Sequence, residues 1–355
     1  MQLFSIILND WGSQLRLFYI KDFQMQFNKN LFIYFGLILG IFGFQSCSND
    51  FVLTEGNVEL PVVYGLISSS SDVNYIRVER TFIDEQTSAF VLAKDSSKLY
   101  FPNLSVRLKN LATNQEITLK RVDGNKEGLQ RSPGVFATAP NYLYKFTSQD
   151  MIIQGNVQYK LTLIKDDGSI LAEATTTAIT KYTVDDVSAP PASGLVAFQY
   201  NTDFKVRWFG DVNALIHDVN FIMNIKEDSS GTVKNKTLVW PMVRNTDKFE
   251  LNIRGRGFYE FMSSNLTANT RIKRSFNDLS IQIISGSKEV RDYISIGQAN
   301  LGITSSGEIP TYSNISNDGL GIFGSRTDII RKNLILTPPT LDSLRNGFIT
   351  KNLNF

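Results

Sequence analysis

The stretch Asn74–Thr81 reads NYIRVERT, and its apolar Ile76 and Val78 alternate with the charged Arg77 and Glu79. Because successive side chains of a β-strand point to opposite faces, this alternation indicates a strand with one buried and one solvent-facing side. The same alternation returns in three further stretches: Leu104, Val106 and Leu108; Ile117 and Leu119; and Tyr159, Leu161 and Leu163. The first half of the chain is therefore predicted to consist of short, half-buried strands.

Turn residues separate these expected strands. Lys165–Ser169 (KDDGS) predicts a hairpin connection, because Asp-Gly supplies the positive φ that such turns need, and Ile170–Ile179 is the returning strand. Val58–Ile67 is expected to be an edge strand, since Pro61 near its start lacks a backbone N–H. Several short strands at this spacing predict an antiparallel sandwich of immunoglobulin-like type over residues 58–180.

The second half of the chain begins after a stretch rich in proline and small residues, Thr183–Gly194 (TVDDVSAPPASG). We interpret 181–194 as a linker and 195–355 as a second β-rich domain. Its expected strands are Phe204–Phe209, Val219–Ile225, Lys236–Val243, Lys248–Ile253 and Leu279–Ile283. Apolar residues at helical spacing predict a helix over 257–266, whereas Glu289–Ile296 fits either a short helix or an edge strand. The predicted fold is mainly β, with one or two short helices in the second domain.

An apolar run near the N-terminus predicts where the protein is located. Leu31–Phe44 (LFIYFGLILGIFGF) follows the basic Lys29, and it is shorter than the roughly 20 apolar residues of a membrane-spanning helix. Its length and basic lead are typical of a secretory signal peptide, which we place at 25–46. A buried core helix is the alternative, but the glycines within the run disfavour a helix in water.

Cys47 is the only cysteine of the chain, and it directly follows this run behind the small Ser46. The arrangement resembles a bacterial lipobox, in which the cysteine becomes the new N-terminus and carries lipid. Residues 47–57 are then a lipidated tether, and a lone cysteine excludes an internal disulfide. Residues 1–24 fit no targeting pattern, so we interpret them as a mis-assigned extension with Met25 as the initiator, a genuine extension being the alternative.

Composition limits the possible partners and the number of domains. The chain has 36 Lys and Arg residues against 34 Asp and Glu residues, a net charge of +2. A charge this small provides no large field that would favour nucleic acid or an anionic membrane surface. At about 150 residues per domain, the length favours two folded domains.

The motif Gly319-x-Gly321-x-x-Gly324 has the spacing of a dinucleotide-binding loop. That function requires a preceding strand and a following helix, whereas a polar loop precedes this motif and Leu320, Ile322 and Phe323 suggest a strand. We therefore interpret the glycines as marking a strand or a close backbone approach. The sequence predicts no bound cofactor.

His217 is the only histidine, with Asp211 and Asp218 nearby in sequence. A catalytic triad could use it, but no G-x-S-x-G nucleophile motif is present, and a zinc site would draw on several His or Cys ligands. We interpret His217 as a structural residue in a loop or partly buried. No metal site and no catalytic residue is predicted. The carboxylates that could support glycoside hydrolysis are scattered: Glu85, Asp95, Glu260 and Asp292.

Two further groups of residues could bind a partner, and each also has a simpler explanation. Five basic residues flank the predicted helix and could contact an acidic partner or lipid headgroups, although a solvated surface is the simpler explanation: Arg254, Arg256, Arg271, Lys273 and Arg274. Trp208 and Trp240 could stack on sugars, but aromatic residues in strands are mostly core.

Several segments together resemble a lipoprotein family of the Bacteroidota whose members have no established function. Val63–Ile67 (VYGLI) with Tyr75–Val78 (YIRV) is similar to its opening, and Asp278–Ile284 with Asp292–Ile294 is similar to its second half. Its most characteristic motif resembles Tyr312–Gly324. The motif residues carried over, with no role assigned, are Tyr312, Ser313, Asn314, Gly319, Gly321, Phe323 and Gly324. The resemblance implies a gene neighbourhood with TonB-dependent outer-membrane receptors.

These observations predict a non-enzymatic lipoprotein that Cys47 anchors in the outer membrane, facing the periplasm or the surface. Its expected partner is a TonB-dependent receptor or another envelope assembly, and no nucleic acid. A surface module that binds glycan or peptide is the alternative. A hydrolase is a weaker alternative, because it would need His217 or two carboxylates in a cleft.

Overall fold

The computed structural model describes residues 59–355 apart from 83, 85–86, 191–192, 270 and 300–310. Cys47 and the segments expected at 1–24, 25–46 and 47–57 lie outside the described residues. Residues 57–355 form one compact unit. Within the described part, the fold is mainly β, as the sequence predicts.

The strands are β1 (Pro61–Ser68), β2 (Val73–Arg80), β3 (Ser105–Asn110), β4 (Glu116–Thr118), β5 (Lys120–Asp123), β6 (Tyr142–Thr147), β7 (Gln158–Ile164), β8 (Ile170–Thr177), β9 (Val187–Ala189), β10 (Leu195–Val196), β11 (Asp203–Trp208), β12 (Ile216–Ser229), β13 (Thr232–Thr246), β14 (Glu250–Arg254), β15 (Ile272–Gly286) and β16 (Leu320–Leu336). The helices are α2 (Ala89–Leu92), α3 (Ser96–Leu99), α4 (Arg256–Asn265), α5 (Lys288–Ala299) and α6 (Pro338–Asn346), with 3-10 turns η1 (Val184–Asp186) and η2 (Lys351–Leu353).

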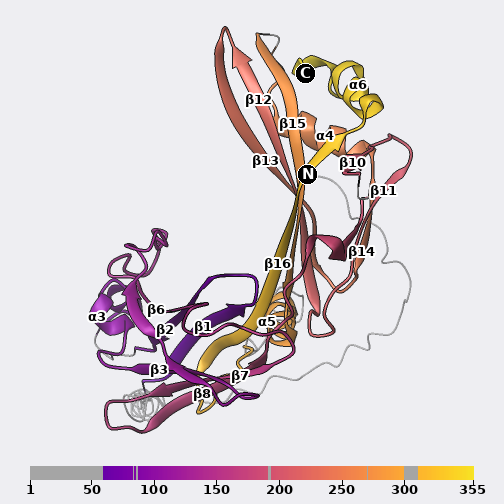
Figure 1. Ribbon diagram of the computed structural model, residues 1–355. Helices are drawn as coiled ribbons and strands as arrows, with labels where there is room; N and C mark the ends of the chain where they lie inside the picture. The colour runs from indigo at the N-terminus through magenta and orange to yellow at the C-terminus, as the bar shows by residue number, and fades with distance from the viewer. Residues whose placement is uncertain (1–58, 83, 85–86, 191–192, 270, 300–310) are drawn as a thin grey trace, which may run out of the picture. The chain divides into compact units, whose positions relative to one another are not determined.

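One large sheet runs through both expected domains, in the order β13-β12-β15-β16-β1-β2-β6-β5. The long strand β16 joins its two halves (Figure 1). The first part of β16 pairs in parallel with β1, from Val62↔Leu320 to Ser68↔Arg326. Its remainder pairs antiparallel with β15, from Gly286↔Arg326 to Leu279↔Leu334. Strands assigned by sequence to separate domains are therefore hydrogen-bonded neighbours.

The first core is a β-sandwich, as expected for residues 58–180, but it also includes the start of β16, which pairs in parallel with β1. A separate four-stranded sheet, β4-β3-β7-β8, supplies one side of this core. The strands β1, β2 and β6 supply the other side, and the inward residues of both sheets form one apolar cluster. The residues that reveal the alternation in the sequence are its members: Ile76, Val78, Val106, Leu108, Leu161 and Leu163.

The position of β1 corrects the expectation of an edge strand, because β1 lies between β16 and β2. Its Pro61 is nevertheless tolerated at the first position of the strand. Pro61 is paired with Arg80 of β2, while the register with β16 begins only at Val62. The missing N–H of Pro61 therefore removes no ladder bond to β16.

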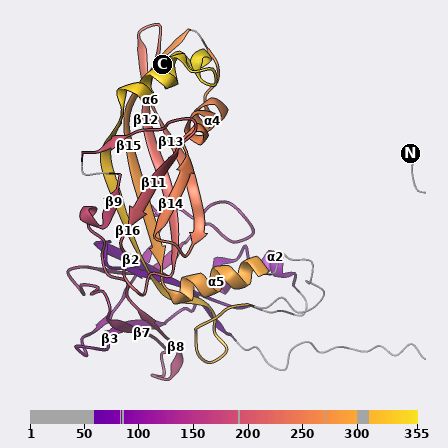
Figure 2. The ribbon, with the colours of Figure 1, turned by 90° about the vertical axis from the view of Figure 1, so that its right-hand side faces the viewer.

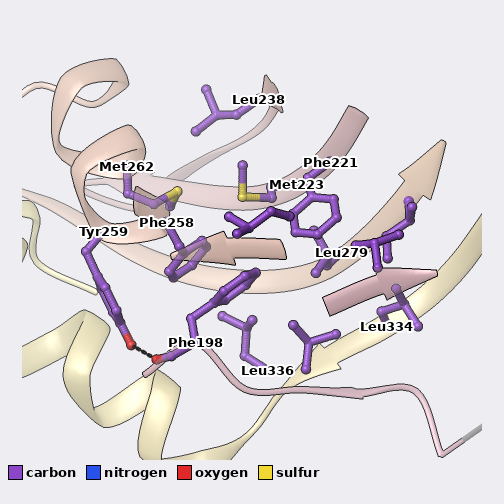
Figure 3. Packing of buried hydrophobic residues seen from close by; sticks show 14 of the residues in the cluster. Phe198, Phe221, Met223, Leu238, Phe258, Tyr259, Met262, Leu279, Leu334 and Leu336 are labelled. Atoms are coloured by element: carbon purple, nitrogen blue, oxygen red, sulfur yellow. Dashed lines mark hydrogen bonds between the residues drawn. The ribbon is translucent and has the colours of Figure 1, made fainter. Parts of the chain in front are cut away.

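The second core lies between β12, β15 and β16 on one side and α4 on the other (Figure 3). The helix expected over 257–266 is α4, and its Phe258, Tyr259 and Met262 are buried. The ring of Phe258 stacks on Phe198 with centroids 4.5 Å apart. The Tyr259 hydroxyl donates a hydrogen bond of 2.6 Å to the Phe198 carbonyl, so its polar end is satisfied inside the core.

The segment left open between helix and strand, Glu289–Ile296, belongs to the helix α5, which lies beside β16 (Figure 2). Its Val290 packs where two glycines leave room on the sheet. A Cβ atom on Gly286 would lie 2.7 Å from the Val290 side chain, and one on Gly324 would lie 3.3 Å from it. The expected linker 181–194 contains η1 and β9, and β9 pairs with β11.

Candidate functional site

The segment Tyr312–Gly324 consists of a loop, 312–319, and the first residues of β16, and Asn314 ties the two together. The Phe323 N–H donates to Asn314 Oδ1 over 2.9 Å, and Asn314 Nδ2 donates to the Phe323 carbonyl over 2.7 Å. The Ser313 hydroxyl donates to the Gly319 carbonyl over 2.6 Å, which closes the loop on itself. The side-chain amide of Asn314 therefore satisfies both backbone groups of Phe323, as a neighbouring strand would.

The same loop is also tied to β8 in the other sheet of the sandwich. The Ser316 N–H donates to the Glu173 carbonyl over 2.8 Å, and the Glu173 N–H donates to Ser316 Oγ over 2.7 Å. Asn317 Nδ2 donates to the Leu171 carbonyl over 3.1 Å. The motif thus links the large sheet to the second sheet of the sandwich.

The glycines of the motif stand where the backbone is crowded. Gly321 has a φ of +100°, and a Cβ atom there would lie 2.0 Å from the Val63 carbonyl oxygen of β1. A Cβ atom on Gly319 would lie 2.5 Å from the Ile315 side chain. A strand follows the motif where a dinucleotide site requires a helix. The interpretation of a glycine-marked strand with a close backbone approach is confirmed.

Tyr312 begins the motif as a half-buried side chain. Burial raises the pKa of its hydroxyl to about 12, and the nearby carboxylates Glu289 and Asp292 of α5 add to the rise. Tyr312 is therefore neutral at any physiological pH.

His217 is a buried residue of β12 rather than a loop residue. Its Nδ1 is hydrogen-bonded to Ser285 Oγ at 2.7 Å, and its ring lies 4.6 Å from that of Phe249 and 5.4 Å from that of Trp208. Burial lowers the pKa of His217 to about 4, against a small opposing effect of Asp247. A neutral imidazole between aromatic rings, beside a serine that is itself buried, is a structural arrangement.

The carboxylates considered beside His217 have other partners. Asp211 accepts from the Thr180 N–H over 2.7 Å, and Asp218 accepts from the Asn245 N–H over 2.9 Å. Neither completes a triad with His217.

The scattered carboxylates that the structure describes also have other partners. Asp95 caps α3 through the Ser97 N–H, Glu260 pairs with Arg256, and Asp292 pairs with Lys288. Glu85 lies outside the described residues. No group of three His, Cys, Asp or Glu residues within the described ranges could hold a metal ion.

Ion pairs account for part of the expected basic cluster. Arg274 is buried, pairs with Glu227 at 2.8 Å and donates to the Thr267 carbonyl over 3.1 Å. Arg254 pairs with Asp203, and Arg256 pairs with Glu260. The positive field that these three side chains would present to an acidic partner is therefore reduced by their own carboxylate neighbours.

Two recesses are both lined by Phe209, and we call them the Phe209 clefts. One has a volume of 330 Å³ and is lined by Asn156, Thr180, Lys181, Tyr182, Asp186, Phe209, Gly210, Asp211 and Val212. The other has a volume of 360 Å³ and is lined by Arg207, Trp208, Phe209, Gly210, Phe249 and Glu250. Phe209 is 62% exposed and lines both recesses, so its ring is available to a ligand.

The end of β11 positions this ring. Along β11 every second side chain, those of Phe204, Val206 and Trp208, packs toward the core. Phe209 comes directly after Trp208, so its side chain points away from the core. The Phe209 N–H donates to the Asp186 carbonyl over 2.8 Å. A Cβ atom on Gly210 would lie 2.3 Å from the Phe249 ring, so only glycine fits there. The hydrogen bond to Asp186 therefore fixes the backbone of Phe209, and close packing against Phe249 fixes that of Gly210.

The polar groups of the Phe209 clefts suit a neutral polar ligand. Arg207 and Glu250 form an exposed pair at 2.8 Å in one cleft. In the other cleft the buried Tyr182 hydroxyl makes no hydrogen bond of normal geometry with the described residues, although the Ser285 hydroxyl and the Asp211 N–H lie close enough to lower its pKa slightly. Burial dominates and raises that pKa to about 12. An exposed aromatic ring beside ionic groups can stack on and hydrogen-bond a sugar or a peptide, whereas the buried Tyr182 hydroxyl is not accessible to one.

Sequence reasoning singled out Trp208 and Trp240 as aromatic candidates and did not single out Phe209. Trp208 is 1% exposed, and Trp240 is packed against the second core. The sequence does contain a signal for Phe209, its position in the alternation of the strand. An aromatic residue that breaks this alternation just before a Gly-Asp turn points away from the core.

No helix within the described ranges is long and apolar enough to cross a membrane. No protein-family model matches the chain, and no curated protein matches it. Among solved structures, the crystal structure of the chicken CNTN1 FN1-FN3 domains is similar over 65% of this chain and 62% of that chain, which is less than two thirds of its length. The identity is 10% and the TM-score is 0.16, so this similarity carries no functional argument.

Proposed function

We propose that this chain is a non-enzymatic lipoprotein, anchored in the outer membrane through Cys47, that serves as an accessory or binding partner of a TonB-dependent receptor or envelope assembly. The observation that carries the proposal is the order Lys29, apolar run Leu31–Phe44, Ser46 and Cys47. The resemblance of the Tyr312–Gly324 motif to receptor-associated lipoproteins supports the proposed partner. The buried His217 and the carboxylates that have other partners provide no support for a hydrolase.

The anchor is tested by metabolic labelling with an alkyne fatty acid in a bacterium that processes lipoproteins. The wild-type chain should be labelled, and Cys47→Ala should lose the label because no other thiol is present. Ser48→Ala is the matched control and should keep it. Labelling that persists in Cys47→Ala would show that Cys47 is not the lipidated residue.

The proposed partner is tested by isolating the tagged chain from its own outer membrane in mild detergent. A TonB-dependent receptor should co-purify with the wild-type chain in a stoichiometric amount. Reproducible isolation of the anchored chain without any receptor would contradict the partner proposal and leave the anchor proposal intact.

A second candidate function, binding of a glycan or peptide, is favoured by one observation, the exposed Phe209 ring that lines two clefts. A glycan array should give hits with the wild-type chain. Phe209→Ala should weaken them by about fivefold, because stacking on an aromatic ring contributes roughly 1 kcal/mol. Phe348→Ala, which removes an 81% exposed ring elsewhere, is the control. Hits that are equally strong in Phe209→Ala would exclude the Phe209 clefts as the glycan site.

A further inference from the structure

Four large apolar side chains lie exposed on two segments of the sandwich, and we call them the apolar patch. Phe90 is 71% exposed and Val91 61% exposed, both on α2. Val135 is 46% exposed and Phe136 41% exposed, both on the connection between β5 and β6. Soluble surfaces tolerate single exposed apolar residues, but a group of this kind indicates an interaction surface.

Contacts between the two segments show that the apolar patch is one surface. The Ala137 N–H, directly after Phe136, donates over 2.8 Å to the carbonyl of Ala93, which follows α2. The Lys94 ammonium also donates to the Gly134 carbonyl. The end of α2 therefore lies against residues 134–137, which brings together the two segments that carry the four apolar side chains.

Cations border the apolar patch. The guanidinium of Arg131 lies 4.8 Å from the centre of the Phe136 ring, but it pairs with Glu79 at 2.7 Å, which compensates its charge. Lys94 follows α2 after one residue. Phenylalanine next to an exposed lysine is the composition of surfaces that rest in the headgroup region of a bilayer, where the rings enter the apolar boundary and the ammonium meets phosphate.

The start of the described fold lies beside the same part of the sandwich. Arg80 of β2 pairs with Glu59, and its guanidinium also donates to the carbonyls of Ser97 over 2.8 Å and Lys98 over 3.0 Å. Ser97 and Lys98 belong to α3, which follows α2 after three residues. The chain therefore enters the fold next to the α2–α3 segment.

We propose that the apolar patch rests on the lipid surface to which Cys47 is anchored, an inference that depends on the proposed anchoring. The chain from Cys47 to Glu59 is about 12 residues long and spans at most about 40 Å when fully extended. This short reach holds the side of the sandwich that carries Glu59, α3 and α2 close to the bilayer at a high effective concentration. The patch then orients the folded chain on the membrane, which the lipid alone does not do.

The inference is tested with lipidated full-length protein in vesicles of phosphatidylethanolamine and phosphatidylglycerol. An acylated Cys47 has no free thiol, so Val135→Cys provides a single site for an environment-sensitive fluorophore. Val212→Cys is the matched control, because Val212 is 84% exposed on another part of the fold. A nitroxide placed on the lipid chains should quench the fluorophore at 135 at least about twofold more than at 212, since only a fluorophore at the bilayer meets it.

Equal quenching at 135 and 212 in protein that floats with the vesicles would overturn the inference while the anchoring proposal stands. Protein that does not float would overturn the anchoring proposal, and the inference with it. Phe90→Asp combined with Phe136→Asp should reduce the quenching at 135 to the level at 212. Both side chains are exposed, so circular dichroism should be unchanged.

A photo-crosslinker attached at the same cysteine distinguishes the other possible occupants. Crosslinking to lipid supports the inference. A covalent dimer of the chain would show that a second copy covers the apolar patch, and an adduct with a receptor would show that a protein partner covers it. If the dimer or the receptor adduct is the main product, the proposal that the apolar patch rests on lipid is wrong.

Discussion

At the scale of single residues, His217 shows how burial changes the role of a titratable group. The only histidine of the chain invites a catalytic interpretation, but its imidazole is 1% exposed and lies between the rings of Trp208 and Phe249. Its hydrogen bond goes to the buried Ser285 hydroxyl. Desolvation disfavours the charged imidazolium, so the pKa falls to about 4.

The depressed pKa of His217 predicts a loss of stability in mild acid. The unfolded chain binds the proton with a pKa of about 6.5, whereas the folded chain binds it only near 4. The neutral His217 therefore stabilises the fold fully above pH 6.5. This stabilisation falls by roughly 3 kcal/mol in total as the pH decreases from about 6.5 to about 4. Urea unfolding at pH 7, 5.5 and 4 should reveal this slope. His217→Gln should remove this part of the slope, and an unchanged slope in His217→Gln would contradict the assignment.

At the scale of secondary-structure elements, β16 depends on the motif Tyr312–Gly324, which contains its first residues. Gly321 lets its backbone approach Val63 of β1, and Asn314 satisfies the backbone of Phe323. These contacts, with the bonds from the same loop to β8, place the parallel pair of β1 and β16 at the centre of the large sheet. The motif that resembles a family signature is therefore explained by packing of strands.

Gly321→Ala should destabilise the fold by roughly 3 kcal/mol, because an alanine at positive φ is strained and its Cβ would collide with the Val63 carbonyl. Gly297→Ala is the matched control, since a Cβ atom added there in the helix α5 would have no atom within 4 Å and alanine favours helix by about 1 kcal/mol. Thermal unfolding should show a lower midpoint for the first variant and an equal or higher midpoint for the second. A midpoint for Gly321→Ala that matches the wild type would refute the close approach.

At the scale of the whole described fold, one sheet connects both expected domains. The two large apolar cores are separate clusters, but β16 contributes Phe323 to one and Leu334 and Leu336 to the other. In the large sheet, β16 is hydrogen-bonded to β1 on one side and to β15 on the other. Loss of β16 would therefore expose both cores.

The shared strand predicts that the two halves unfold together. Hydrogen exchange measured by mass spectrometry in increasing urea should show β3 and β7 losing protection at the same urea concentration as β12 and β15. Gly321→Ala should shift both groups of amides by the same amount. Two separate transitions, with only the first half shifted by Gly321→Ala, would instead support independent domains divided at 181–194.

The elements that the amino-acid sequence alone identifies are those whose signals are local. Alternation revealed β2, β3 and β7, helical spacing revealed α4, and the crowded glycines of the motif were interpreted correctly. The lipid anchor at Cys47 is also a local signal, and it stays a prediction because Cys47 lies outside the described residues.

Only the tertiary structure shows which strands pair and which side chains contact one another. The parallel pairing of β1 with β16 joins residues about 260 positions apart, and no periodicity encodes a partner at that separation. For the same reason the exposed ring of Phe209, the burial of His217 and the assembly of the apolar patch from α2 and residues 134–137 became visible only in three dimensions. Local patterns reflect which face of an element is buried, whereas surfaces and clefts depend on contacts between distant segments.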